Sequence, residues 1–334
     1  MNTERHEQKK IRIGVAGAGK MGQNHIRVLS ELNSVFDLAG IYDPDQEKVA
    51  VAERYGVRFY ESYDEMLADV EAVTLPCPTS LHKEMALKAA KKGVHALLEK
   101  PMAETQEDAM EICEAFMEKK LKLTVGYVER FNPVVKAMAD ILHDMEIVSI
   151  EVHRCSPFDS RIYDVDVVAD LMIHDLDIVM NAFGKGMPEW VSAIGKKVYT
   201  TRFADYAQAT LCFPDGVLAF VTTSRSTEDK IRTVCVHAKG AYIEGDLLNR
   251  TLTIKRGTNY LEDAKASSIK YKQSSITEQV VLPNVEPLKE EMLAFGKAIA
   301  DDTMPQITWG QVLKTMEVLD MIEGDIYLQM EGEA

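Results

Sequence analysis

"IRIGVAGAGKMGQNHIRVL", residues 11–29, decides how the first part of the chain folds. The stretch begins as a short apolar run typical of a buried strand and ends in a pattern typical of an amphipathic helix. Between them stand three glycines in the spacing G-x-G-x-x-G: Gly17, Gly19 and Gly22. Such glycines allow a tight turn, close approach of the backbone to a pyrophosphate, and close packing of helix on strand. We therefore expect a dinucleotide to bind over the helix N-terminus, at Lys20 and Met21.

A carboxylate follows the second predicted strand. "LAGIYDPD" (38–45) places Asp43 at the C-terminal end of that strand, 21 residues after Gly22. A carboxylate at this position can accept hydrogen bonds from both ribose hydroxyls of an adenosine and would repel a 2′-phosphate. The alternative is a plain turn residue beside Pro44. Together with the glycines, Asp43 predicts NAD(H), in preference to NADP(H), as the cofactor.

Strand and helix patterns alternate from residue 10 to about residue 125. Strands that alternate with helices imply right-handed crossovers and a parallel, doubly wound sheet. One of the helices opens with a capping box, in which Thr105 precedes Asp108 by one helical turn. The sequence thus predicts an α/β Rossmann domain that binds NAD over residues 1–125.

The pattern changes after Gly126. Strand-like segments follow one another from Trp190 to about Val281, and "FPDGVLAF" places a hairpin turn at Asp215 and Gly216. Helices are expected over 133–143, 168–184, 287–300 and 309–323. Residues 126–334 are therefore predicted to form an α+β domain with a large, mainly antiparallel sheet. We assign substrate binding and oligomerisation to this domain.

Composition narrows the class of protein. The chain has 334 residues, with 38 Lys and Arg against 53 Asp and Glu, and its formal net charge of -15 argues against binding to nucleic acid. The cysteines form no CxxC pair and show no metal-ligand spacing, so neither a metal site nor a disulfide scaffold is expected. The N-terminus lacks the apolar core of a signal peptide, and no stretch is long and apolar enough for a membrane span. We expect a cytoplasmic protein with no membrane partner.

Three further stretches complete a recognisable pattern: "TLPCPTSLHKEMALKAAKKGVHALLEKPMAET" (74–105), "GYVERFNP" (126–133) and "ADLMIHDLD" (169–177). With the glycine motif upstream, the chain resembles the Gfo/Idh/MocA family, the relatives of glucose-fructose oxidoreductase and inositol dehydrogenase. The resemblance spans the first domain and reaches about Gly184. It implies an oxidoreductase that transfers hydride between a nicotinamide cofactor and a secondary hydroxyl of a sugar, sugar nucleotide or cyclitol.

The resemblance also implies roles for individual residues. Glu99, Lys100 and Pro101 match the family's E-K-P motif, whose lysine reaches both the nicotinamide ribose and the substrate hydroxyl. Asp170 and His174 match its D-x-x-x-H motif, which carries substrate contacts and the proton acceptor. To the glycine turn and Asp43, the implied cofactor site adds Pro76, Thr79, His82, Glu99, Lys100 and Arg130. The implied substrate site comprises Lys100, Tyr127, Arg154, Arg161, Asp170 and His174.

The oxidation of an alcohol requires the same residue types. Hydride leaves a carbinol carbon only as the hydroxyl proton is lost, so a base and a positive group are needed near the oxygen. We assign the base to His174, the cation to Lys100, and to Asp170 a contact with the imidazole ring or with a substrate hydroxyl. On a helix, Asp170, His174 and Asp177 share one face. A buried histidine with solvated aspartates is the alternative for this helix taken alone.

The segment around the D-x-x-x-H motif most resembles the subgroup of UDP-N-acetylglucosamine 3-dehydrogenases, with Arg161 and Asp164 at matching positions. Arg154 or Arg161 is expected to meet a diphosphate by paired hydrogen bonds, and ion pairing at the surface explains Arg154 equally well. The segment departs from the subgroup at Asp166, where glycine is usual, and at Met172, where a small residue is usual. An added carboxylate beside the pocket would oppose an anionic sugar nucleotide.

Two other functions remain open. A hydrolase of the same family retains NAD and cleaves glycosides through transient oxidation, and a sensor would keep the nucleotide fold without catalysis. The intact Lys100 and His174 favour a dehydrogenase over both. Apolar residues that alternate on an exposed sheet face, as in "YAQATLCF" and "VLAFVTTS", predict a homodimer or homotetramer formed through that sheet. His25, on the first helix, is expected to serve packing and not chemistry.

Overall fold

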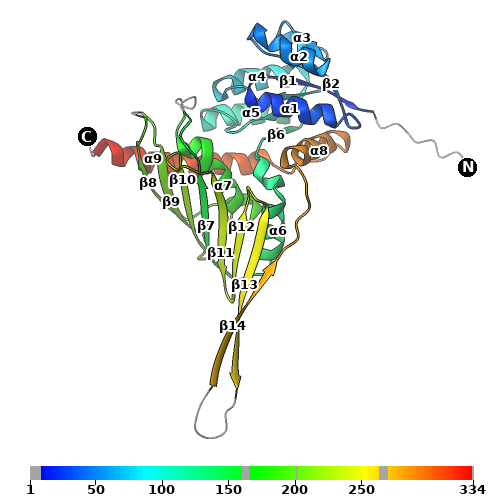
Figure 1. The fold of residues 1–334 in the computed structure, drawn as a ribbon. Helices are drawn as coiled ribbons and strands as arrows, with labels where there is room; N and C mark the ends of the chain where they lie inside the picture. The colour runs from blue at the N-terminus through cyan, green and yellow to red at the C-terminus, as the bar shows by residue number, and fades with distance from the viewer. Residues whose placement is uncertain (1–8, 160–164, 201, 263–269, 333–334) are drawn as a thin grey trace, which may run out of the picture. The chain divides into compact units, whose positions relative to one another are not determined.

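A computed structural model shows the fold of the chain (Figure 1). It describes residues 9–159, 165–200, 202–262 and 270–332. The chain divides into two compact units. The first unit consists of the residues up to Phe131 together with Val285–Met316, and the second consists of Asn132–Asn284 together with the residues from Glu317 onward.

The first unit is built on a six-stranded parallel sheet with the strand order β3-β2-β1-β4-β5-β6. The strands are β1 (Ile11–Ala16), β2 (Phe36–Tyr42), β3 (Arg58–Phe59), β4 (Ala72–Leu75), β5 (His95–Leu98) and β6 (Leu123–Val125). The strand order reverses between β1 and β4, and ligands bind at the carboxyl ends of the strands beside such a reversal. The predicted doubly wound Rossmann sheet is confirmed.

Helices and short turns connect these strands. They are α1 (Lys20–Glu31), η1 (Gln46–Lys48), α2 (Val49–Tyr55), α3 (Tyr63–Leu67), α4 (Thr79–Lys92), α5 (Gln106–Glu118) and η2 (Val128–Phe131). Helix α5 begins as its capping box predicts, because the Thr105 hydroxyl accepts a hydrogen bond from the Asp108 N–H over 3.1 Å. None of the described helices combines the length and the apolar character that a membrane span requires.

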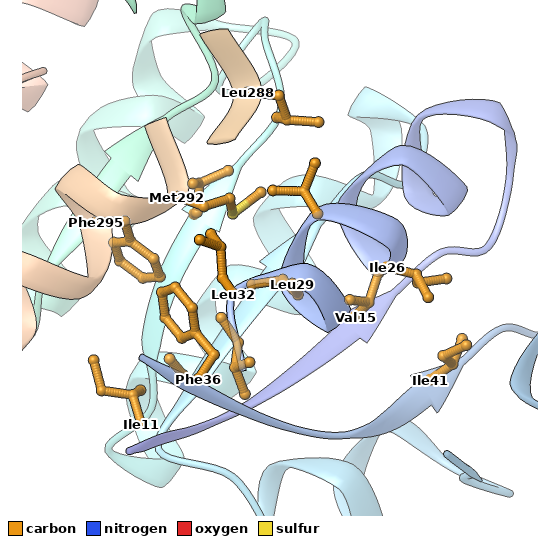
Figure 2. Close-up of a cluster of buried hydrophobic side chains, with 14 of the residues drawn as sticks. Ile11, Val15, Ile26, Leu29, Leu32, Phe36, Ile41, Leu288, Met292 and Phe295 are labelled. Carbon is orange, nitrogen blue, oxygen red and sulfur yellow. The ribbon is translucent and has the colours of Figure 1, made fainter. Parts of the chain in front are cut away.

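Helix α8 (Pro287–Ala300) belongs to the first unit, although the sequence predicted it as part of the second domain. Its apolar residues share one buried cluster with residues of α1 and β2: Leu29, Phe36, Leu288, Met292 and Phe295 (Figure 2). The first unit also runs on to Phe131 and does not end at residue 125. The sequence pattern could not reveal this return of the chain, because an apolar helix face looks the same whichever sheet it covers.

The second unit contains an eight-stranded sheet with the order β14-β13-β12-β11-β7-β10-β9-β8. All neighbouring strands are antiparallel except β10 and β7, which confirms the predicted mainly antiparallel sheet. The strands are β7 (Ile147–Cys155), β8 (Trp190–Lys196), β9 (Tyr206–Cys212), β10 (Leu218–Ser224), β11 (Ile231–Ala238), β12 (Ala241–Asp246), β13 (Thr251–Glu262) and β14 (Lys270–Gln279). Strands β9 and β10 form the predicted hairpin, with Gly216 at a φ of +82°.

Helices of the second unit include α6 (Pro133–Leu142) and a segment that carries the D-x-x-x-H motif. This segment consists of α7 (Ile173–Asp177) flanked by two π-helical stretches, η3 (Val168–Met172) and η4 (Ile178–Ala182). Helix α9 (Trp309–Gly332) begins in the first unit and ends in the second. It is longer than the predicted 309–323.

Candidate active site

Two close backbone contacts shape the glycine turn. Gly17 has a φ of +113°, which favours glycine, and its N–H donates to the Tyr42 carbonyl over 2.8 Å. An added Cβ at Gly22 would lie 1.9 Å from the Gly17 carbonyl oxygen, so α1 can approach β1 here only through a glycine. These two glycines therefore serve the turn and the packing of helix on strand.

Gly19 meets a different requirement. An added Cβ there would find no described atom within 4 Å beyond its chain neighbours, and its φ of -66° suits any residue. Gly19 caps α1 without a side chain, and the first N–H groups of a helix have no partner within that helix. Open space over the N–H groups that begin at Lys20 and Met21 suits a pyrophosphate. The turn therefore fits the phosphates of a dinucleotide.

Asp43 is buried just after β2, and its carboxylate joins two loops. Its Oδ2 accepts a hydrogen bond from the Ala18 N–H over 2.7 Å, and its Oδ1 accepts one from the Asp45 N–H over 2.9 Å. The turn-residue interpretation therefore describes part of its role. Because a carboxylate can accept about four hydrogen bonds, these two contacts leave capacity for ribose hydroxyls as well.

A cavity of about 530 Å³ opens beside Asp43 in the first unit. Its lining includes four residues of the predicted cofactor site: Gly17, Gly19, Asp43 and Pro76. Two lysines of its wall form ion pairs with acidic neighbours, Lys48 with Asp45 at 3.4 Å and Lys88 with Glu84 at 2.7 Å. The cavity thus joins a helix terminus suited to phosphate to a carboxylate suited to a ribose.

Thr79 and His82 lie at the start of α4, next to this cavity. The buried His82 ring places Nδ1 3.0 Å from the Pro101 carbonyl and Nε2 3.1 Å from the Cys77 carbonyl. Burial lowers the pKa of His82, although these carbonyl contacts act in the opposite direction. His82 therefore supports the loop after β4 and the turn at Pro101.

The E-K-P motif follows β5, and its carboxylate is held on two sides. The Glu99 Oε1 lies 3.0 Å from His25 Nε2, and its Oε2 accepts a hydrogen bond from the Lys100 N–H over 3.4 Å. An added Cβ at Gly126 would lie 3.0 Å from the same Oε2. The expectation that His25 only packs is incomplete, because this buried ring also orients Glu99. His25 follows Gly22 by one helical turn and so lies near the carboxyl ends of the strands, where Glu99 also lies. That position could have predicted the contact between the two side chains.

The two predicted site residues of the "GYVERFNP" segment differ in burial. Arg130 of η2 is half-buried and donates to Gln311 Oε1 over 3.0 Å. Tyr127 is fully buried. The first unit thus presents Arg130 near its surface, whereas the Tyr127 side chain offers no exposed area to a substrate.

Two of the three polar residues that were predicted to share one face of the D-x-x-x-H segment are partly exposed. Asp170 and His174 are partly exposed, whereas Asp177 is buried and accepts a hydrogen bond from Asn181 Nδ2 over 2.9 Å. Asp170 lies in the π stretch η3, where a turn holds more residues than in an α-helix, so the α spacing assumed from the sequence does not hold between Asp170 and Asp177. Asp170 and His174 are therefore the pair that this segment offers to a ligand.

Arg154 occupies a position that differs from the expected diphosphate contact. It is almost fully buried in β7, and its Nε and Nη2 each lie 2.8 Å from Asp175 Oδ1. Ion pairing, the alternative explanation, thus describes Arg154, but the pair lies inside the unit and not at its surface. We leave Arg154 out of the substrate site for this reason. Arg161 and Asp164 lie outside the residues that the structure describes.

The two departures from the dehydrogenase subgroup are both buried. The Asp166 Oδ1 accepts hydrogen bonds from the N–H groups of Val168 and Ala169, each over 2.9 Å. Its Oδ2 accepts one from the Tyr327 hydroxyl, also over 2.9 Å. The Asp166 carboxylate is therefore committed to holding the start of η3 and to α9. Asp166 therefore does not face a ligand directly, and Met172 likewise packs inside the unit.

Known protein families match both parts of the chain. Residues 11–127 match the family described as "Oxidoreductase family, NAD-binding Rossmann fold". Residues 146–243 match the "GFO/IDH/MocA C-terminal domain".

Individual relatives extend this similarity. A UDP-N-acetylglucosamine 3-dehydrogenase of Acidithiobacillus ferrooxidans is 34% identical over 245 residues, which are 73% of this chain and 76% of that protein. A solved structure of UDP-N-acetylglucosamine 3-dehydrogenase from the same organism has a TM-score of 0.85 at 29% identity, and the match covers 95% of this chain and 98% of that chain. An inositol 2-dehydrogenase of Saccharopolyspora erythraea is 31% identical over 184 residues, which are 52% of this chain and 54% of that protein. Since relatives with this identity and coverage share one family, the chain belongs to the Gfo/Idh/MocA oxidoreductases and is an NAD(P)-dependent dehydrogenase.

Proposed function

We propose that this dehydrogenase transfers hydride between NAD and a secondary hydroxyl of a sugar or sugar nucleotide, with UDP-N-acetylglucosamine as the first candidate. One observation carries the proposal: Asp43 holds the glycine turn and lines the cavity that adjoins the open terminus of α1. The similarity to a UDP-N-acetylglucosamine 3-dehydrogenase supports the substrate class. Asp166 and Met172, the two departures from that subgroup, are buried and take up none of the surface that a substrate could contact.

The catalytic roles follow from the chemistry of the side chains. NAD, when bound, supplies a nicotinamide ring that accepts the hydride. The Lys100 ammonium stabilises the negative charge that develops on the substrate oxygen, and His174 takes the hydroxyl proton. Asp170 accepts a hydrogen bond from a substrate hydroxyl. Glu99 restrains the backbone at Lys100, because it accepts a hydrogen bond from the Lys100 N–H.

NAD is the proposed cofactor in preference to NADP. The Asp43 carboxylate at the cavity would repel a 2′-phosphate. Lys48 and Lys88, which also line the cavity, are partly neutralised by their acidic partners. The local charge therefore favours a free ribose over a phosphorylated one.

The exposed face of the second unit's sheet supports a homo-oligomer. Strand register places four exposed apolar residues on the same face: Trp190, Ile194, Leu218 and Ile231. The half-buried Phe220 lies on this face in β10, between β7 and β9. Exposed apolar surface is costly in water, so we propose that two copies cover this face in a dimer or tetramer.

The cysteines support a reducing compartment as the location. Burial raises the pKa of Cys77 and of Cys113 to about 12, which keeps both as unreactive thiols. The described cysteines are free thiols. We propose the cytoplasm on these grounds.

A panel of UDP-hexosamines, inositols and free aldoses tests the activity. With NAD present, we expect the absorbance of NADH to rise with at least one UDP-hexosamine. Tight NAD binding without turnover of any hydroxyl compound would contradict the proposal and favour the sensor alternative. Release of free sugar from a glycoside without net NADH would favour the hydrolase alternative.

The substitutions Lys100→Ala and His174→Ala test the assigned roles. Each should lower kcat by about 10²- to 10⁴-fold, because each removes a group that acts on the substrate oxygen, while NAD affinity is retained. If both residues act in the same step, the fold decrease in kcat of the double variant should be smaller than the product of the two single fold decreases. His143→Ala, which changes an exposed histidine at the end of α6, is the control and should keep the wild-type kcat. Unchanged kcat in either test variant would remove that residue from its role.

The substitution Asp43→Asn tests the cofactor preference. The amide keeps an oxygen for the Ala18 N–H but removes the charge that would repel a 2′-phosphate. We expect the ratio of kcat/KM for NAD to that for NADP to fall at least about tenfold. Glu47→Gln removes an exposed carboxylate from the same loop and is the matched control. An equal ratio in wild type and Asp43→Asn would refute the preference assigned to Asp43.

The substitution Phe220→Arg tests the proposed interface. A guanidinium on this face should not be buried against a second copy, so the variant is expected to elute as a monomer. Light scattering with size-exclusion chromatography measures the mass of both proteins. A wild-type protein that is monomeric at high concentration would show that this face is not an interface.

A further inference from the structure

Arg225 is a buried cation to which the proposed function assigns no catalytic or binding role. It directly follows β10, and its side chain is only 2% exposed. Its backbone N–H donates to the Asp205 carbonyl over 2.8 Å, which fixes the chain where β10 ends. A buried guanidinium requires acceptors and a counter-charge, because an unpaired charge in the interior is strongly destabilising.

Among the described residues, the acceptors of its Nη1 and Nη2 groups lie at the start of the D-x-x-x-H segment. Arg225 Nη1 donates to the Val165 carbonyl over 2.8 Å, and Nη2 donates to the Asp166 carbonyl over 3.2 Å. Nη2 also lies 3.2 Å from Asp170 Oδ2, with which it forms an ion pair. One side chain from the sheet thus binds both the backbone that leads into η3 and the motif aspartate.

The backbone that Arg225 binds is held from another side as well. Asp166 caps the start of η3 through the N–H groups of Val168 and Ala169, and it accepts the Tyr327 hydroxyl of α9. Arg225 therefore binds a segment that Asp166 also connects to α9. Its contact with Asp170 is the one that reaches a partly exposed side chain.

The pair of Arg154 and Asp175 differs from the pair of Arg225 and Asp170 in the exposure of its aspartate. Both pairs join a buried arginine of the sheet to an aspartate of the same helical segment. The Asp175 side chain is 0% exposed, whereas the Asp170 side chain is 24% exposed. Arg154 therefore serves the interior alone, while Arg225 supports a carboxylate that a ligand can reach.

We propose that Arg225 is a positioning residue that fixes the orientation of Asp170 as a hydrogen-bond acceptor for a substrate hydroxyl. The role of Asp170 rests on the proposed function. Arg225 pairs with Oδ2 of Asp170, and the partly exposed carboxylate is the group that we assign to the substrate hydroxyl. A guanidinium suits this task because its planar set of donors binds two carbonyls and a carboxylate at once.

Kinetics of Arg225→Met and Arg225→Lys in the full-length enzyme test the proposal. Loss of a charged hydrogen bond should raise KM for the sugar substrate at least about tenfold and lower kcat in Arg225→Met. Arg225→Lys keeps the charge and should recover part of both losses. The dissociation constant for NADH should stay within about twofold of wild type, since Arg225 does not belong to the cofactor site.

A double-mutant comparison separates positioning from general loss of stability. If Arg225 acts through Asp170, then Arg225→Met should have little further effect on KM and kcat in an Asp170→Asn background. Arg154→Lys is the control, since it disturbs the ion pair of an arginine that is about as buried as Arg225. Its kcat should follow the folded fraction measured by thermal denaturation. Additive losses, or wild-type KM and kcat in Arg225→Met, would overturn the proposal.

Hydrogen exchange supplies a readout that does not depend on turnover. In Arg225→Met, or in Arg225→Lys if the first variant does not fold, the amides of residues 165–170 should exchange faster than in wild type, and those of Ile178–Ala182 should not. Unchanged exchange at 165–170 would overturn the proposal even if no substrate of the panel is turned over. If the wild-type enzyme is inactive on the panel while residues 165–170 exchange faster in Arg225→Met, only the proposed function is contradicted.

Discussion

The chain can build its first unit only if two positions, one in the turn after β1 and one in the first turn of α1, carry no side chain. At Gly22 an added Cβ would lie 1.9 Å from the carbonyl oxygen of Gly17, and Gly17 itself has a left-handed φ. This approach aims the first turn of α1 at the carboxyl ends of the strands, beside the reversal of strand order. Asp43 then holds the turn through the Ala18 N–H. The cavity and the proposed choice of cofactor both follow from this arrangement.

A second constraint acts in the other unit, where buried charges must be paired. The sheet sends two arginines into its covered side, and each meets an aspartate of the segment from Val168 to Ala182. Pairing with Arg154 takes Asp175 out of reach of any ligand, while pairing with Arg225 leaves Asp170 partly exposed. The same physical requirement thus yields one purely structural pair and one pair with a proposed part in catalysis.

Local features of the chain could be predicted from sequence, and contacts between distant segments could not. The glycine spacing and the capping box at Thr105 depend on residues within one or two turns, so the turn and helix α5 are where the sequence placed them. The packing of α8 on α1 and the support of Asp170 by Arg225 join distant segments. Such contacts depend on which faces meet, and periodicity carries no information on that. The π turns around α7 also escaped prediction, because a helical pattern assumes uniform spacing.

The substitution Gly19→Ala tests the central claim most directly, because the structure separates folding from cofactor binding at this residue. The protein has open space for a methyl group there, and the φ of -66° suits alanine, so the melting temperature should stay within about 2 °C of wild type. The methyl group would occupy the space assigned to the pyrophosphate, so the dissociation constant for NADH should rise at least about tenfold in a fluorescence titration. A folded Gly19→Ala protein that binds NADH as tightly as wild type would contradict the account.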